Sequence, residues 1–162
     1  HLGRSGMRWT VLRPVRFMEN YLMRETAFDG VHRGVHRHMF HPELPMQVIA
    51  VEDIAVFAAL AFADPDRYDG RTLELAGDGP TPVEAAAAIS AATGRTVRYE
   101  QVPLEEAAGF GPEIAETWRL WNGGHVWRAD VRALRELHPG LRTLEEWLAG
   151  SGAALIRALP AG

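Results

Sequence analysis

Short apolar runs alternate along this chain with longer segments of helical periodicity. The first run, MRWTVLRP, is rich in residues that favour strands, and it ends at Pro14, which lacks the N–H that a sheet ladder requires. Three later runs predict strands as well, and the last is half exposed because apolar and polar residues alternate in it. The four predicted strands are Met7 to Pro14, Met46 to Val51, Arg71 to Gly77 and Arg95 to Pro103.

Helices are predicted between and after these strands. A helix is expected from Phe17 to Phe28, where apolar residues recur at helical spacing, and the pair Asp29-Gly30 ends it. Leu2 to Ser5 is expected to form the last turn of an earlier helix. The final third of the chain is expected to be helical, in three segments that cover residues 105–124, 129–140 and 143–159.

Capping residues predict where several helices begin and end. In a capping box, a threonine and the glutamate three residues later cap each other's backbone N–H groups. Asp53 is expected to be the N-cap of a helix from Ile54 to Ala63; a catalytic acid is the alternative, and the position favours the cap. The other signals are the boxes Thr81 with Glu84 and Thr143 with Glu146, Pro82 at a first helical position, and Gly94 as a helix terminator.

The order of these elements predicts the fold class. Strands that alternate with helices and tight Gly/Pro turns are typical of an α/β protein with mostly parallel pairing. We therefore expect a single α/β unit with a helical tail. The chain begins HLGRSG without an initiator methionine, and we interpret it as a piece of a longer protein.

Composition and charge narrow the function classes. The formal net charge is −4, so nucleic acid or an anionic membrane is not expected as a direct partner, and no apolar run is long enough to span a membrane. Cysteine is absent, and all 17 basic residues are arginine. Schiff-base chemistry, a P-loop lysine and a Tyr-x-x-x-Lys pair are therefore excluded within this chain. The arginine, alanine and glycine usage suggests a high-GC bacterial source, and we expect a cytoplasmic protein.

Four histidines lie close together in VHRGVHRHMFHPE. They are His32, His36, His38 and His41, and with Glu43 they raise the possibility of a zinc site. The segment lacks an H-E-x-x-H motif, and its glycines argue against a helix that would align the imidazoles. A mobile, solvated loop or an irregular hairpin between Val31 and Pro45 is the favoured interpretation, and no metal is expected.

Two other features have ordinary structural interpretations. The GDG at Gly77 to Gly79 lacks the spacing of a dinucleotide-binding glycine motif, so a strand-to-helix turn is favoured. Trp118 and Trp121 could stack on a ligand, but their spacing on a helix is more typical of core or lid packing.

The segment RPVRFMEN, residues 13–20, is the strongest candidate for a site. Ligands of doubly wound sheets bind beyond the carboxyl ends of the strands, and this segment follows a predicted core strand. Phe17 and Met18 could form an apolar wall, and Asn20 offers a donor and an acceptor. The alternative is a plain strand exit in which Phe17 packs in the core and Asn20 caps locally. The residues alone do not separate these two interpretations.

Three stretches, in this order and spacing, resemble the NmrA-like family. They are SGMRWTVLRPVRFMEN, VIAVEDIAVFAALAFADPDRYDGRTLELAGDGPTPVEAAAAIS and GRTVRYEQVPLEE, and the resemblance extends from about Ser5 to Leu148. The family comprises atypical members of the short-chain dehydrogenase/reductase superfamily with an NAD(P)-binding Rossmann fold. Its glycine-rich phosphate turn is not in this chain. The resemblance implies that residues 1–162 are the C-terminal portion of the NAD(P)-binding domain, with a small substrate-side subdomain and a helical tail.

The same resemblance implies roles for individual residues. Pro14, Val15 and Phe17 would contact the cofactor, NADP or NAD, while Phe17, Met18, Asn20 and Tyr21 would line the substrate cleft. The implied function is an NAD(P)H-dependent reductase of a small quinone or carbonyl compound. The alternative is a non-catalytic redox sensor that acts through a protein partner, and a homodimer is also possible. Without the phosphate turn, the isolated chain is expected to bind dinucleotide poorly.

Overall fold

Parallel strand pairs form the centre of the molecule. The computed structural model describes residues 4, 6–24 and 26–159. β1 (Thr10–Pro14) pairs in parallel with β6 (Arg71–Leu75), and β2 (Arg16–Phe17) pairs in parallel with β5 (Val48–Ile49). The chain passes from the first pair to the second without a break, because the Val15 N–H donates to the Leu75 carbonyl at 3.0 Å. The predicted α/β class with parallel pairing is thus confirmed.

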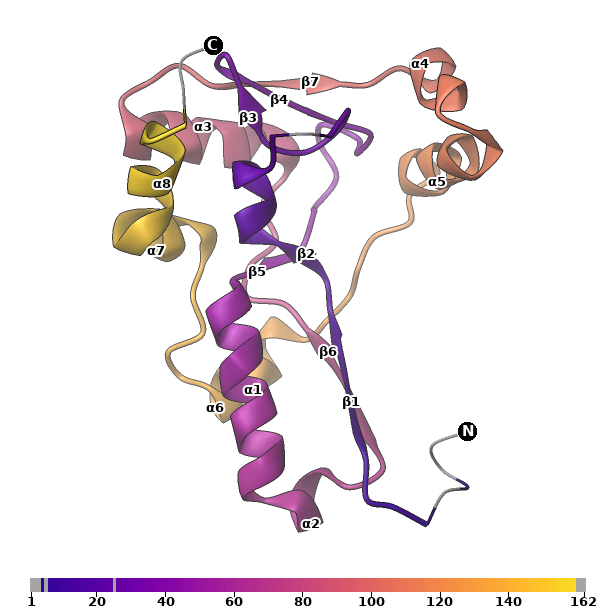
Figure 1. Cartoon of the computed structure of the whole chain (residues 1–162), viewed down its shortest axis with the longest axis vertical. Coiled ribbons are helices and arrows are strands. Elements are labelled where there is room, and N and C mark those ends of the chain that lie inside the picture. The colour runs from indigo at the N-terminus through magenta and orange to yellow at the C-terminus, as the bar shows by residue number, and fades with distance from the viewer. Residues whose placement is uncertain (1–3, 5, 25, 160–162) are drawn as a thin grey trace.

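Helices cover these strands and form the tail of the chain. Helix α1 lies along β1 and β6, and α3 packs with the C-terminal helices at the opposite end of the molecule (Figure 1). The helices are α1 (Val51–Ala63), α2 (Pro65–Tyr68), α3 (Pro82–Thr93), α4 (Leu104–Gly109), α5 (Pro112–Asn122), α6 (Val131–Leu137), α7 (Leu144–Trp147) and α8 (Ala153–Arg157). A π-helical segment, η3 (Leu148–Gly152), joins α7 to α8.

Both predicted capping boxes are confirmed. The Thr81 hydroxyl accepts from the Glu84 N–H at 3.1 Å, and the Glu84 carboxylate accepts from the Thr81 N–H at 2.8 Å. Thr143 and Glu146 cap the start of α7 in the same way. Gly94 ends α3 with a φ of 69°, a conformation that L side chains rarely adopt.

The predicted helix from Phe17 to Phe28 is wrong. Only a 3-10 turn, η2 (Met18–Leu22), forms after β2. Its tighter winding allows the side chains of Met18 and Tyr21, three residues apart, to be buried together in the core. The chain then reverses at Asp29 and Gly30, which have φ angles of 71° and 74°. The helical turn predicted for Leu2 to Ser5 lies outside the described residues except for Arg4.

The prediction that Asp53 caps α1 is also wrong. The helix begins at Val51 with Ala50 as the N-cap, so Asp53 lies within the first turn and is 2% exposed. Its carboxylate accepts hydrogen bonds from Arg142, with Nη2 at 2.9 Å, and lies 3.2 Å from Nε2 of His138. These partners are 85 to 89 residues away in the chain, and local sequence pattern does not indicate them.

The histidine segment forms a hairpin in a second sheet. β3 (Val31–His32) pairs antiparallel with β4 (Val35–His38), and β4 pairs in parallel with β7 (Arg98–Gln101). The hairpin alternative is confirmed for residues 31–38, and the prediction of a solvated loop is wrong for His36 and His38. His36 is fully buried and His38 is 8% exposed, because alternate residues of β4 face the interior.

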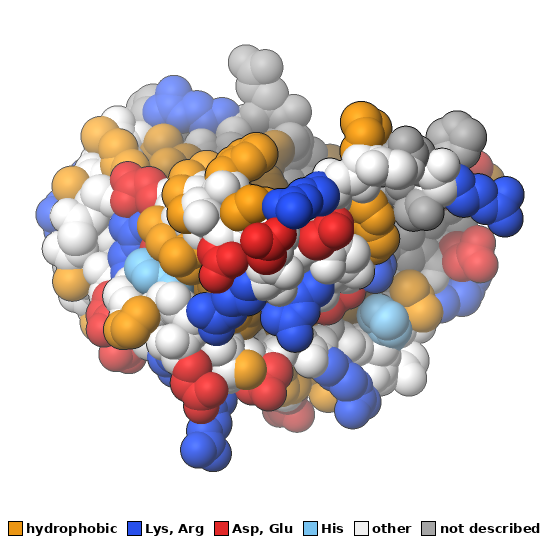
Figure 2. Space-filling view, turned by 90° about the horizontal axis from the view of Figure 1, so that it is seen from below, with side chains coloured by type: hydrophobic (Ala, Val, Ile, Leu, Met, Phe, Trp, Pro, Cys, Tyr) orange, Lys and Arg blue, Asp and Glu red, His pale blue; other side chains and the backbone are white. Residues whose placement is uncertain are grey.

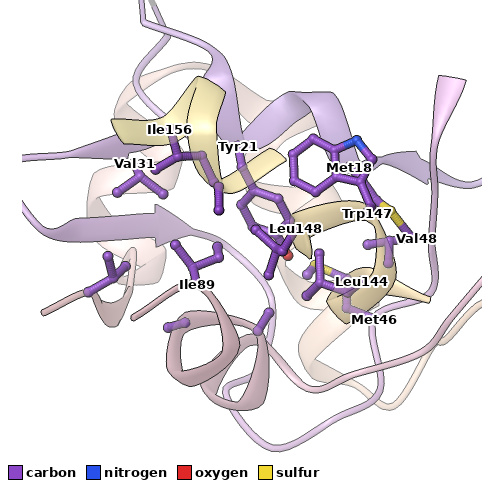
Figure 3. Close-up of a cluster of buried hydrophobic side chains, with 14 of the residues drawn as sticks. Met18, Tyr21, Val31, Met46, Val48, Ile89, Leu144, Trp147, Leu148 and Ile156 are labelled. Atoms are coloured by element: carbon purple, nitrogen blue, oxygen red, sulfur yellow. The ribbon is translucent and has the colours of Figure 1, made fainter. Parts of the chain in front are cut away.

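Buried side chains form three neighbouring clusters. The largest joins η2 to β5, α3 and the C-terminal helices, and Figure 3 shows Met18, Tyr21, Leu144 and Trp147 in it. A second cluster packs α1 and α6 against β1 and β6, and a small third one lies under α4 and α5.

No helix of the described residues is both long and apolar enough to cross a membrane. On the face seen in Figure 2, acidic and arginine side chains are interspersed.

Candidate functional site

The candidate site lies where β2 and β5 end side by side. Because the two strands are parallel, their carboxyl ends meet at one edge, which in open α/β sheets is where ligands bind. β2 leads into η2, and β5 leads into the N-terminus of α1 (Figure 1). We call residues 14–20 at this edge the rim segment.

Three of the six predicted site residues expose side-chain surface on this segment. Phe17 is 37% exposed, and Pro14 and Asn20 are half-buried. The Asn20 carbonyl accepts from the N–H groups of Met23 and Gly30, at 3.1 and 2.9 Å, which fixes its backbone. Within the described residues the Asn20 side-chain amide has no hydrogen-bond partner, so both its donor and its acceptor are free for a ligand.

The other three predicted residues lie behind the rim. Val15 is 6% exposed and packs in the cluster around Phe57, while Met18 and Tyr21 are fully buried in the largest cluster (Figure 3). They support the exposed residues from below. The six predicted residues thus lie along residues 14–21, the rim segment and the residue after it, with Pro14, Phe17 and Asn20 on the outside.

Glu19 is a rim residue that the sequence interpretation missed. Its Oε2 accepts from the Val51 N–H at 3.1 Å and so caps the N-terminus of α1 from another element. The N-terminus of a helix carries partial positive charge, which a carboxylate stabilises. An acidic residue two positions after a strand end is a weak signal in the sequence, and only the fold shows that Glu19 and the N-terminus of α1 meet.

A buried ion pair anchors the rim from below. Nε of Arg16 donates to Oδ1 of Asp29 at 2.9 Å, Nη2 contacts the same oxygen, and the Arg16 side chain is only 3% exposed. Burial opposes ionisation of Asp29, yet the hydrogen bond from His38 and the charge of Arg16 hold its pKa well below the usual value. The pair ties β2 to the turn that precedes the histidine hairpin.

His36 and His38, the two buried histidines of β4, are uncharged at neutral pH. Burial, reinforced by the Arg16 charge, lowers the pKa of His36 to about 3. Burial also lowers the pKa of His38, although Asp29 opposes that effect. In the part of the chain that is described, no group of three or more His, Cys, Asp or Glu residues is arranged to hold a metal ion.

The GDG segment and the two tryptophans Trp118 and Trp121 have structural roles. The N–H groups of Gly77 and Asp78 both donate to the Val48 carbonyl, at 2.8 and 3.1 Å, so GDG is the predicted turn out of β6. The indole N–H of Trp118 donates to the Val102 carbonyl at 2.8 Å, and Trp121 packs against the largest cluster.

Comparison with known proteins identifies the family of this chain. The sequence profile of the NmrA-like family matches residues 2–148. An NAD(P)H azoreductase of Xenophilus azovorans is 36% identical over 104 residues, which is 64% of this chain and 35% of that protein. The chain therefore spans about a third of the length of this curated relative.

Solved structures share the fold. An NADPH-dependent quinone oxidoreductase of Escherichia coli is 25% identical, with a TM-score of 0.69 over 91% of this chain and 56% of that one. NmrA, a negative transcriptional regulator solved with NAD, is 19% identical, with a TM-score of 0.65 over 93% of this chain and 54% of that one. NmrA was also solved with NADP, so the expected cofactors are those that this neighbour binds. With a family match over almost its whole length, the chain belongs to the NmrA-like family.

Proposed function

We propose that the protein containing this chain is an NAD(P)H-dependent reductase of a small quinone or carbonyl compound. The observation that carries the proposal is the 36% identity to an NAD(P)H azoreductase. In this chain, the parallel strands β2 and β5 end side by side at the rim segment, where a ligand could bind. The similarity to a quinone oxidoreductase points in the same direction. Azo groups and quinones are both conjugated and electron-poor, which is the kind of acceptor that takes a hydride.

The chain would supply one side of the site. It spans 35% of the azoreductase and 56% of the quinone oxidoreductase, and the glycine-rich phosphate turn of the family is not among its residues. In our proposal, residues 1–162 are the C-terminal portion of the NAD(P)-binding domain. The N-terminal portion would bind the pyrophosphate at a helix N-terminus, where backbone N–H groups and the helix dipole favour an anion.

The residues of the rim fit the reactive end of such a cofactor. Phe17 exposes an aromatic ring, and together with the half-buried Pro14 it presents an apolar surface that would hold a flat nicotinamide and exclude water, while Val15 supports this surface from behind. The free amide of Asn20 could donate to a carbonyl oxygen of the substrate, and Met18 and Tyr21 would keep both residues in place. When bound, NAD(P)H supplies the hydride; the protein supplies orientation.

The test is turnover by the full-length protein. NADPH and NADH oxidation would be followed by absorbance with a panel of quinones, azo dyes and unsaturated carbonyl compounds. We expect turnover with at least one acceptor, and we expect Phe17→Ala and Asn20→Ala each to lower kcat/KM about tenfold or more, because each removes one contact to a bound ring or carbonyl. Phe110→Ala changes another exposed phenylalanine far along the chain, 52% exposed against 37% for Phe17, and should leave kcat/KM unchanged.

The alternative function gives a different result. Tight dinucleotide binding without turnover across the whole panel would contradict the reductase and favour the redox sensor. In that case, a protein partner captured by the full-length protein should be released or retained depending on the oxidation state of the bound dinucleotide. An equal loss of activity in Phe17→Ala and Phe110→Ala would show that the rim has no special role.

A further inference from the structure

Four buried polar atoms without a partner belong to neighbouring side chains beneath the rim. Among the described residues, the buried side-chain nitrogen and oxygen atoms that lack a hydrogen bond are Nη1 of Arg16, Oη of Tyr21, Nε2 of His36 and Nδ1 of His38. Leaving such an atom unpaired loses its hydrogen bonds to water without replacement, and native proteins rarely tolerate several of them together.

The four side chains and Asp29 form a closed ring of contacts. The Arg16 guanidinium lies 4.4 Å from the centroid of the Tyr21 ring, whose edge meets the His36 ring at a centroid distance of 5.0 Å. The His36 and His38 rings are 6.3 Å apart, and Nε2 of His38 lies 3.6 Å from Asp29, which closes the ring at Arg16. We call this arrangement the buried polar ring.

A hydrogen bond sets the tautomer of His36, and a contact with a charged group favours one tautomer of His38. Nδ1 of His36 lies 2.9 Å from the Gly30 carbonyl, which can only accept, so Nδ1 carries the proton and Nε2 is a bare acceptor. Nε2 of His38 lies 3.6 Å from Oδ1 of the negatively charged Asp29, which favours the proton on Nε2 and leaves Nδ1 as the bare acceptor. Both rings are neutral at pH 7, since burial lowers both pKa values.

The unpaired atoms are complementary to one kind of ligand. The two imidazole nitrogens accept, the Arg16 nitrogen donates, and the Tyr21 hydroxyl does either. The charges of Arg16 and Asp29 cancel, so the site offers no net charge that would compensate the desolvation of a buried ion. An uncharged molecule with two donors and two acceptors fits, and the smallest of these is water.

We infer that the buried polar ring binds one ordered water molecule. The water donates its two protons to Nε2 of His36 and Nδ1 of His38, and it accepts from Nη1 of Arg16, with Oη of Tyr21 as the fourth partner. Internal waters usually make about three such bonds. Tyr99 is excluded from the set, because its hydroxyl already lies 2.9 and 2.6 Å from the carbonyl oxygens of His38 and Phe40.

This water would connect the rim to the second sheet. Arg16 and Tyr21 flank Phe17 and Asn20 in sequence, whereas His36 and His38 belong to β4. The water is therefore a bridge between the segment that carries the candidate site and the hairpin behind it. The inference concerns the interior of this chain and does not depend on the proposed reductase activity.

Histidine NMR of the full-length protein at pH 7 tests the inference. We expect the ring proton on Nδ1 of His36 and on Nε2 of His38, and cross-relaxation from a long-lived water to the carbon-bound ring protons of both. His32, exposed on the same hairpin, should show no such signal. The opposite tautomer at either ring, or cross-relaxation at neither, would overturn the inference.

Two controls exclude other sources of the cross-relaxation: the variant Tyr21→Phe and the metal chelator EDTA. Exchange through the Tyr21 hydroxyl could relay magnetisation to His36, so Tyr21→Phe should keep both cross-peaks, and their loss would count against a bound water. If that variant does not fold, a high-resolution crystal structure of the unchanged protein must show density within about 3.2 Å of both imidazole nitrogens. A shift of the histidine signals on adding EDTA would reveal a metal ion and refute the proposal.

Discussion

Arg16 organises the residues around it by being both buried and paired. Its side chain is 3% exposed, contacts Asp29 and lies over the Tyr21 ring, so a full charge is held inside the protein by one carboxylate and one aromatic face. Such a pair is costly to break, because the remaining partner would be left charged and buried. Burial also keeps the neighbouring His36 and His38 uncharged, which makes the stability of the fold depend on pH.

Stability is expected to fall as the pH drops below about 6.5. The folded-state pKa of His36 is about 3, below the unfolded value near 6.5, so the unfolded state takes up the proton first. Between these values the loss grows and reaches about 2 kcal/mol at pH 5 from His36 alone. His38, whose pKa is also lowered, adds to the loss, and the lowered pKa of Asp29 extends it to more acidic pH.

Urea unfolding of the full-length protein at pH 7 and pH 5 measures this effect. His36→Gln removes the titrating group and should reduce the difference in unfolding free energy between the two pH values. His32→Gln, on the exposed side of the same hairpin, should leave the difference unchanged. A His36→Gln protein with the full wild-type pH dependence would contradict the assignment.

At the scale of elements, the C-terminal tail is joined to α1 by a buried carboxylate. Asp53 in the first turn of α1 binds Arg142, which immediately precedes the capping box of α7, and His138, which follows α6. Glu52 also contacts Arg142, but its side chain is 77% exposed. One arginine thus meets a buried and an exposed acid side by side.

The two acids should differ strongly in their contribution to stability. Asp53→Asn leaves Arg142 without its buried counter-charge and should lower the free energy of unfolding by about 3 kcal/mol. Glu52→Gln removes an exposed contact and should cost less than about 1 kcal/mol. Urea unfolding of both variants checks this prediction, and similar losses in the two would contradict it.

The π-helical segment η3 depends on a glycine that has no room for a side chain. A Cβ on Gly152 would overlap the Trp147 ring, which is buried in the largest cluster, whereas a Cβ on Gly150 would meet nothing within 4 Å. Gly152 therefore allows the tail to turn tightly around the indole.

Alanine substitutions in η3 should show this contrast. Gly152→Ala is expected to lower the free energy of unfolding by about 1–3 kcal/mol through overpacking. Gly150→Ala should be neutral or stabilising by up to about 1 kcal/mol, since alanine favours helical backbone. Thermal or urea unfolding distinguishes them, and equal stability of the two variants would show that the Trp147 ring can move aside.

At the scale of the whole molecule, the first sheet is open. β1 pairs with β6 on one side only within the described residues, and a groove between β1 and α1 is lined by apolar side chains that include Trp9, Leu12 and Phe62. Phe62 is 87% exposed. An unpaired strand edge next to exposed apolar surface favours self-association.

The isolated 162-residue chain should therefore bind dinucleotide poorly and self-associate. It lacks the glycine-rich turn that would bind the pyrophosphate, so calorimetry with NADPH should give an affinity at least about 100-fold below that of the full-length protein. Sedimentation should show concentration-dependent association of the isolated chain. Micromolar binding of NADPH by the isolated chain would contradict the division of the site proposed above.

The features that the sequence alone determined are the local ones. Pro82, the two capping boxes and Gly94 act through contacts within a few residues, and runs such as Arg71 to Leu75 have one pattern that suits only a strand. The resemblance to the NmrA-like family likewise rests on ordered stretches of sequence. These signals do not require knowledge of what lies nearby in space.

Tertiary structure decided everything that depends on distant partners. Asp53 is a buried ion-pair residue and not a cap, because Arg142 reaches it from 89 residues away. The periodicity after Phe17 predicted a helix, but packing of Met18 and Tyr21 against the C-terminal helices stops it after one 3-10 turn. His36 and His38 become neutral core residues because the fold buries them. Burial and pairing with distant residues change the free energy of folding by more than local helix propensity does. The local pattern of apolar and polar residues does not show which distant residues will meet.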